Sequence, residues 1–192
     1  MKTWRVAIAR DTAVPSLGLH GLHVAFKGMP HAEVVGFFDS RADDMEAVMA
    51  ATGARRHYRD YARMLDAENP DIVVLCSRHP CDHLPQIEAA AKASCHIYCE
   101  KPLSASLLEA DRIVDLAERS GIRICMAHPG RYAPAFRTMK AMLERGEIGR
   151  PLSVHGRGKC DHRDGGEDLI VLGTHILDLQ VFFFGPPEYV YA

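Results

Sequence analysis

Short apolar runs alternate with amphipathic segments along the first two thirds of the chain. Five runs, most of them rich in β-branched residues, predict strands of a sheet covered on both faces: 4–9, 33–38, 72–76, 96–99 and 122–126. Helical patterns occupy the segments beside them: 19–28, 43–52, 60–68, 83–93 and 104–120. Strands that alternate with helices predict right-handed βαβ units and a parallel sheet. Residues 1–127 are therefore predicted to form a Rossmann-like, doubly wound α/β domain.

The segment 104–120 gives the clearest helical signal. Ser106 and Glu109 have capping-box spacing, and Gly121 stands where a helix end favours a residue that tolerates positive φ. Apolar residues at helical spacing predict one buried face that comprises Leu107, Ala110, Val114 and Ala117.

The pattern changes after residue 127. Residues 128–150 predict a connecting helix, and 151–154 and 189–192 resemble short strands. The segment 167–184 predicts a helix that is apolar on nearly every side. We therefore expect 151–192 to be the incomplete start of a second α+β domain. We also expect a partner subunit to cover the apolar helix, or the chain to be a truncated product.

Composition narrows the class of protein. The chain has 192 residues, 47% hydrophobic and 25% charged, which is the range of globular proteins. A net charge of −2 argues against a nucleic-acid or anionic-membrane surface. Apolar stretches are too short for a spanning helix, and the N-terminus lacks a signal-peptide pattern, so we expect a cytoplasmic protein. The six cysteines lack metal-ligand spacing, so we expect reduced thiols and no metal site.

A partial dinucleotide fingerprint follows the first predicted strand. Ser16, Gly18 and Gly21 have the spacing of a G-x-G-x-x-G loop with Ser in the first position. Asp39 closes the second predicted strand, where a carboxylate can accept both ribose hydroxyls of NAD and would repel the 2′-phosphate of NADP. Arg41 nearby would soften that preference. These residues predict an NAD site, with NADP less favoured.

Two further residues suggest acid–base chemistry. Lys101, in Glu-Lys-Pro directly after the strand 96–99, is placed to polarise a substrate hydroxyl or relay its proton. His175 lies on the apolar helix, and Asp178 at i+3 shares its face and is placed to orient the ring. We take Lys101, His175 and Asp178 as the candidate catalytic residues.

Four segments in this order carry a family resemblance: EKP at 100–102, HPGRYAPAF at 128–136, ERGEIGRPLSV at 144–154 and GGEDLIVLGTHILDL at 165–179. Together they resemble the glucose–fructose oxidoreductase/inositol dehydrogenase (Gfo/Idh/MocA) family over essentially the whole chain. The resemblance implies a two-domain NAD(P)-dependent oxidoreductase that acts on a sugar, a polyol or a related small molecule, and a homo-oligomer.

The resemblance also assigns residues. The family's catalytic set is the Lys of EKP, a later Asp, and a His four residues beyond it; Lys101 and His175 match, whereas the Asp position is Val171. Asp168 lies one turn further back and is a candidate substitute. The basic–aromatic pair Arg131-Tyr132 matches one near the family's cleft. The cofactor contacts implied by the resemblance include Ser77, His79, His83, Glu100 and Lys101.

The altered glycine loop and Val171 leave two alternatives open. The first is a non-catalytic nucleotide-binding or sensor protein of the same fold. The second is an enzyme that uses NAD redox transiently for a net elimination or hydrolysis.

Overall fold

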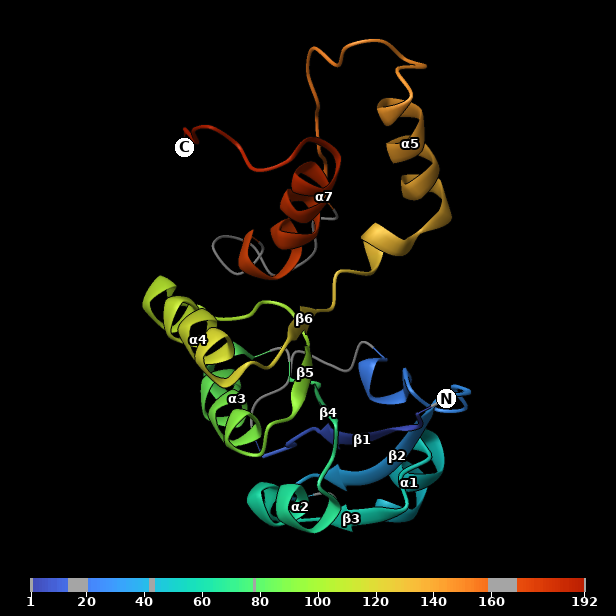
Figure 1. Ribbon diagram of the computed structural model, residues 1–192, viewed down its shortest axis with the longest axis vertical. Helices are drawn as coiled ribbons and strands as arrows, with labels where there is room; N and C mark the ends of the chain where they lie inside the picture. Colours follow the sequence, from blue (N-terminus) through green and yellow to red (C-terminus); the bar gives the residue numbers. More distant parts are fainter. Residues whose placement is uncertain (1, 14–20, 42–43, 78, 159–168, 192) are drawn as a thin grey trace. The chain divides into compact units, whose positions relative to one another are not determined.

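The chain forms two compact units, Met1–Ala127 and His128–Ala192, which we describe separately (Figure 1). The computed structural model describes residues 2–13, 21–41, 44–77, 79–158 and 169–191.

The first unit is built on a six-stranded sheet in which every adjacent pair is parallel, in the order β3-β2-β1-β4-β5-β6. This order confirms the predicted Rossmann-like fold. The strands are β1 (Trp4–Ala9), β2 (Ala32–Phe38), β3 (Arg56–Tyr58), β4 (Ile72–Leu75), β5 (His96–Cys99) and β6 (Ile124–Met126).

Side chains alternate between the two faces of the central strands. In β1, Ala7 and Ala9 pack in the cluster that holds Met64, Ile87 and Ile113 of three helices. Val6 and Ile8, which alternate with them along β1, pack in a second cluster on the opposite face of the sheet. Both faces of the sheet are therefore covered, which explains why its central strands are largely apolar.

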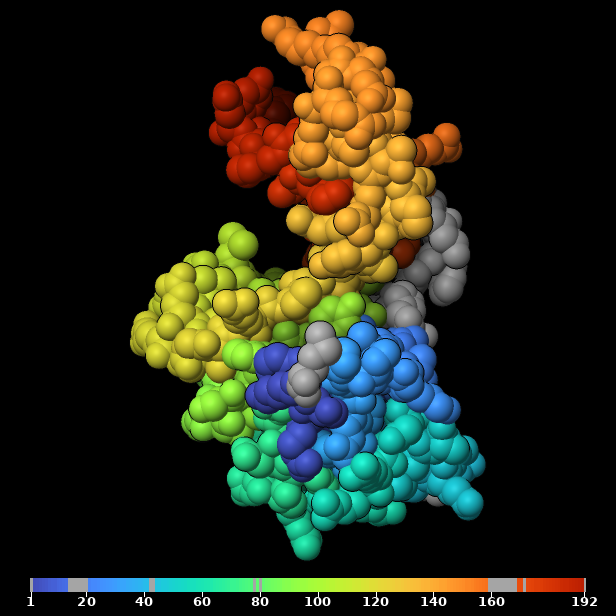
Figure 2. Space-filling model, turned by 45° about the vertical axis from the view of Figure 1, so that its right-hand side comes forward, coloured from blue at the N-terminus to red at the C-terminus, as the bar shows by residue number. Residues whose placement is uncertain are grey.

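Helices cover the sheet at bounds close to those expected, with one exception. They are α1 (Met45–Thr52), α2 (Tyr61–Glu68), α3 (His83–Lys92) and α4 (Leu107–Ser120), with 3₁₀ turns η1 (Leu22–Val24) and η2 (Pro80–Asp82). The helix predicted over 19–28 is wrong within the described residues, which hold only η1 and turns. Gly21 and Gly28 both adopt positive φ and confine the regular part to a single turn. Residues 21–31 form part of the surface of this unit (Figure 2, light blue).

The buried face of α4 matches the predicted one only in part: Ala117 packs against the core as expected, but Ile113 is buried instead of Val114. Ile113 is 1% exposed, whereas Leu107 is 86% and Val114 51% exposed. The apolar residues of α4 fit two neighbouring helix faces, one centred on Val114 and one on Ile113. Packing against the sheet buries the face that carries Ile113.

The predicted capping box is also wrong, because the Ser106 side chain makes no cap hydrogen bond and Ser106 N donates to Ser104 Oγ (2.9 Å) rather than to Glu109. The Glu109 carboxylate accepts from Ser104 Oγ instead (3.0 Å).

Strand β3 was not predicted because its residues are polar, and a buried carboxylate explains them. Glu68, at the end of α2, has a fully buried side chain that accepts a 2.5 Å hydrogen bond from Tyr58. Arg56 Nε lies 2.9 Å and Arg5 Nη2 3.3 Å from the same carboxylate. A Cβ at Gly36 of β2 would lie 3.1 Å from Glu68 Cγ, so glycine leaves room for this network.

The second unit is helical in its described part. It contains η3 (Pro129–Tyr132), α5 (Pro134–Glu144), a π-helical turn η4 (Leu169–Gly173) and α7 (Thr174–Phe184). Phe136 and Phe183 meet edge to face at 6.0 Å, and Lys140 Nζ donates to the Phe183 carbonyl (3.1 Å).

The short strands expected at 151–154 and 189–192 are not formed in residues 151–154 and 189–191. A strand needs a hydrogen-bonded neighbour, and no other described segment pairs with them. In the described residues, no helix is both long and apolar enough to cross a membrane.

The face of α4 gives a stability test. Ile113→Ala is expected to lower the free energy of unfolding by about 3 kcal/mol, because it leaves a cavity in the core. Leu107→Ala, in the same helix but exposed, is expected to change it by less than about 0.5 kcal/mol. Urea unfolding of both variants measures the difference, and equal losses would contradict the observed face.

Candidate functional site

The carboxyl ends of the parallel strands meet at one edge of the sheet, where open α/β sheets bind ligands. Asp39 follows β2, Ser77 follows β4, and Glu100 and Lys101 follow β5 (Figure 1). Gly21 precedes η1 with φ of 83°, and a Cβ built there meets nothing within 4 Å. The sheet therefore brings these predicted residues to one edge. Ser16, Gly18 and Asp168 lie outside the described residues.

Asp39 is fully buried, and its carboxylate is surrounded by donors. Oδ1 accepts from Thr12 N (3.1 Å), Thr12 Oγ1 (2.8 Å) and Arg41 N (3.1 Å). Oδ2 accepts from Arg10 Nη2 (3.2 Å) and Nε (3.3 Å). Arg41 thus contributes its backbone N–H here. Sequence reasoning missed Arg10 and Thr12, although polar residues directly after an apolar strand were a signal.

The pKa of Asp39 reflects these contacts. Burial on its own raises this pKa, but hydrogen bonds from Arg41, Thr12 and Arg10 outweigh it and hold the pKa below its usual range. The carboxylate is therefore kept charged.

A hollow of about 390 Å³ lies at the end of β3, beside the backbone of Asp39. His57, Arg59 and Arg63 supply cationic or titratable groups to its lining. The His57 Nε2 atom lies 3.3 Å from the Asp39 carbonyl oxygen, and Asp39 N donates to the Tyr58 carbonyl (3.1 Å). This hollow therefore adjoins the segment that carries the buried carboxylate.

Lys101 is 1% exposed and Glu100 4% exposed, so neither is a solvated loop residue. Lys101 N donates to Glu100 Oε2 (2.9 Å), and the Lys101–Pro102 bond is cis. Both side chains are therefore held within the fold at the carboxyl end of β5, the edge where open α/β sheets bind ligands.

His83 was predicted to contact a cofactor, but its ring nitrogens are both engaged within the fold. Nε2 lies 2.9 Å from the Ser77 carbonyl oxygen and Nδ1 lies 3.0 Å from that of Leu103. The side chain is completely buried. His83 therefore connects the loop after β4 to the turn after Lys101, and its predicted contact with a cofactor stays a prediction.

His79 is close to another side chain of the same loop. Its Nδ1 atom lies 2.8 Å from Cys81 Sγ, and its backbone N–H donates to Ser77 Oγ (3.1 Å). The roles predicted for Ser77 and His79 in cofactor binding stay predictions.

In the second unit, Asp178 binds Arg131. Arg131 Nε lies 2.8 and 2.9 Å from the two carboxylate oxygens, and Nη2 lies 2.7 Å from Oδ1. The His128 Nδ1 atom is 3.8 Å from Oδ2, and the His128 ring meets that of His175 edge to face at 5.8 Å. Local spacing missed both His128 and the Arg131 contact. The orientation of His175 by Asp178, and the pairing of His175 with Lys101 of the other unit, stay predictions.

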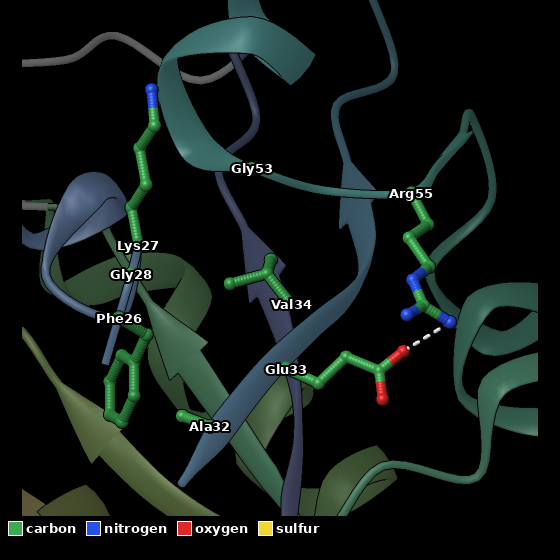
Figure 3. A pocket seen from close by; sticks show the side chains of 8 residues that line it. All are labelled: Phe26, Lys27, Gly28, Ala32, Glu33, Val34, Gly53 and Arg55. Carbon is green, nitrogen blue, oxygen red and sulfur yellow. Dashed lines mark ion pairs between the residues drawn. The ribbon is translucent and has the colours of Figure 1, made fainter. Parts of the chain in front are cut away.

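A second hollow, of about 350 Å³, opens at the opposite edge of the sheet, at the start of β2 (Figure 3). Its charged groups already have partners within the protein. Glu33 forms an ion pair with Arg55, and Lys27 Nζ donates to the Ala50 carbonyl (2.6 Å). We therefore place the candidate site at the carboxyl edge.

The described cysteines are free thiols: Cys76, Cys81, Cys95, Cys99 and Cys125. Burial raises the pKa of Cys95 to about 11, so this thiol stays protonated at neutral pH. Within the described ranges, no group of three or more His, Cys, Asp or Glu is arranged to hold a metal ion.

The contacts of His83 predict a stability loss. His83→Leu removes the ring that lies between the Ser77 and Leu103 carbonyl oxygens and leaves at least one of them without its N–H donor, so it is expected to lower the free energy of unfolding by about 3 kcal/mol. The exposed His31 offers a matched control, and His31→Leu is expected to change it by less than about 0.5 kcal/mol. Similar losses of unfolding free energy for the two variants in urea would show that the contacts of His83 with Ser77 and Leu103 do not stabilise the fold.

The lowered pKa of Asp39 predicts a pH dependence. Its contribution to stability is fully present above the ordinary pKa of about 3.9 and is lost as pH falls through the lower, folded-state value. Asp39→Asn should therefore lose less stability than the wild type between pH 7 and pH 3. Asp115→Asn, at an exposed ion pair, serves as the control and should match the wild type. An unchanged pH dependence in Asp39→Asn would refute this assignment.

Comparisons with known proteins agree with this fold. The family model "Oxidoreductase family, NAD-binding Rossmann fold" (GFO_IDH_MocA) matches residues 18–128. D-Apiose dehydrogenase from Paraburkholderia graminis is 34% identical over 171 residues, 84% of this chain and 45% of that protein. Myo-inositol 2-dehydrogenase from Thermotoga maritima is 26% identical over 152 residues, 79% and 45% of the two chains.

Among solved structures, apo scyllo-inositol dehydrogenase from Lactobacillus casei superposes with a TM-score of 0.79 at 18% identity. The match covers 96% of this chain and 55% of that one, and it shows a shared fold. The chain spans about half the length of these relatives. The match to the family model and the identity to the apiose enzyme show that this chain belongs to the Gfo/Idh/MocA family of NAD-binding oxidoreductases.

Proposed function

We propose that the chain binds NAD at the carboxyl edge of its first unit and takes part in hydride transfer to or from a sugar, polyol or related hydroxy compound. The observation that carries this proposal is the buried Lys101 at the same sheet edge as the buried Asp39. The names of the relatives, which include apiose and inositol dehydrogenases, support the substrate class.

The residues at this edge fit a dinucleotide. Asp39 is the carboxylate for the adenosine ribose, Gly21 leaves open space before η1, and Ser16 and Gly18 complete the loop for the pyrophosphate. The hollow at the end of β3, next to the Asp39 backbone, supports a place for the adenosine there. NAD is the cofactor, with NADP less favoured, because a 2′-phosphate would approach the Asp39 carboxylate.

Bound NAD supplies the hydride acceptor. Lys101 donates a hydrogen bond to the substrate hydroxyl and stabilises the negative charge that develops on its oxygen. His175 accepts the hydroxyl proton, as a general base. Asp178 acts in the same cluster, where Arg131 fixes its carboxylate through two nitrogens.

A second candidate is a non-catalytic nucleotide-binding or sensor protein of the same fold. Val171, at the position where the family carries a catalytic Asp, favours it. A transient use of NAD redox for elimination or hydrolysis is the third candidate, and cofactor that stays bound through purification would favour it.

The exposed apolar side chains, the free cysteines and the net charge support proposals about the oligomeric state, the cellular compartment and the class of ligand. A homo-oligomer would cover apolar side chains that α7 leaves exposed, among them Leu177 (52%) and Phe184 (45%). The free cysteines suit the reducing cytoplasm, and the net charge of −2 suits a small-molecule ligand rather than nucleic acid.

Lys101→Met tests the catalytic proposal. NADH should bind the variant within about threefold of the wild-type Kd, measured by nucleotide fluorescence. Turnover of a sugar and polyol panel with NAD should fall by at least about 100-fold, because proton-transfer groups contribute this much. Lys92→Met, exposed at the end of α3, is the matched control and should change neither quantity.

Three outcomes separate the candidates. Wild-type protein that fails to bind NADH at millimolar concentration overturns the NAD site. Binding without turnover of any panel member favours the non-catalytic candidate. Unchanged turnover in Lys101→Met removes Lys101 from the chemistry.

A further inference from the structure

Arg10 occupies an unusual position, directly after β1 and against Asp39. Both of its bonds, from Nη2 (3.2 Å) and Nε (3.3 Å), reach the same carboxylate oxygen, Oδ2. Its guanidinium also lies 5.4 Å from the centroid of the Phe37 ring, within cation–π range. The side chain is 16% exposed, so ion pair and ring together hold it over the end of β2.

The Asp39 carboxylate has little acceptor capacity left for a ligand. An ionised carboxylate offers about four lone-pair positions. Thr12 and Arg41 direct three donors to Oδ1, and Arg10 directs two to Oδ2. A ribose that donates its hydroxyls to Asp39 must therefore displace a bond, and the bonds of Arg10 are the longest of the five.

The charge of Asp39 is also compensated. An unpaired carboxylate repels a 2′-phosphate, whereas a carboxylate paired with Arg10 at 3.2 Å presents no net charge to it. The guanidinium fork is moreover a preferred partner of phosphate oxygens. The same residue thus weakens the feature that favours NAD and offers a contact to its 2′-phosphorylated counterpart.

We propose that Arg10 is a cofactor-specificity residue that relaxes the discrimination of Asp39 against 2′-phosphorylated dinucleotides. The inference rests on the proposed NAD site and refines it. NAD remains preferred, but by a small factor, because Arg10 competes with ribose hydroxyls for Oδ2 and attracts a phosphate.

Binding measurements test this without any need for turnover. Kd values for NADH and NADPH are measured by nucleotide fluorescence and calorimetry in the full chain. Arg10→Met should raise the ratio of the NADPH Kd to the NADH Kd at least tenfold, with the NADH Kd unchanged or lower. The control variant Arg112→Met breaks an exposed ion pair between Arg112 of α4 and Glu88 of α3, and it should leave the ratio within twofold of the wild type.

A second pair of variants covers the case in which Arg10→Met does not fold, since it leaves the buried Asp39 with fewer partners. Asp39→Asn leaves Arg10 unopposed and should lower the ratio at least tenfold. Asp39→Asn combined with Arg10→Met contains neither charge and should lose that shift.

The outcomes are distinguishable. An unchanged ratio in Arg10→Met, or equal ratios in Asp39→Asn with and without Arg10→Met, overturns the role of Arg10 and leaves the NAD site standing. Wild-type protein that binds neither nucleotide overturns the proposed function and this inference together.

Discussion

Parallel pairing of buried strands is the constraint on which the rest of the first unit depends. Each strand end hydrogen-bonds to its neighbour: Arg10 N to Phe38 O, Cys76 N to Ala9 O, and Glu100 N to Leu75 O. The central strands β1, β4 and β5 are largely apolar, so polar side chains become frequent where the chain emerges at the carboxyl edge. Residues far apart in sequence, such as Asp39 and Lys101, therefore reach one rim of the sheet.

The sequence predicted the parts of the fold that apolar burial determines. Strands β1 and β5 fall where the apolar runs place them, because β-branched and apolar residues suit a sheet covered on both faces. Strand β3 was not predicted from the sequence because its polar residues Arg56 and Tyr58 bind the buried carboxylate of Glu68 in α2, which lies 10 to 12 residues away. The buried face of α4 was predicted only in part, for another reason. Helical periodicity allows two neighbouring faces to be buried, and only tertiary packing determines that Ile113 lies in the core.

The candidate site was likewise predictable in its positions but not in its contacts. Its positions follow from the ends of strands, which a pattern can locate, but its contacts join residues that the pattern cannot relate. Arg10 reaches Asp39 across 29 residues, and Arg131 reaches Asp178 across 47. Helical spacing relates Asp178 to its near neighbour His175, but it could not predict that the more distant Arg131 binds the Asp178 carboxylate. His83 could be found by its place in the loop, but its backbone partners could not.

The buried hydrogen-bond network around Asp39 has a consequence for how the sequence of such a domain changes in evolution. The Asp39 carboxylate joins the segment after β1 to the end of β2, and the proposed nucleotide selectivity depends on the same group. A lineage that drifts at position 39 alone leaves an arginine without its counter-ion, and one that drifts at position 10 alone leaves a buried charge. Homologous chains should therefore exchange these two residues together, as a single heritable unit, when their nucleotide changes.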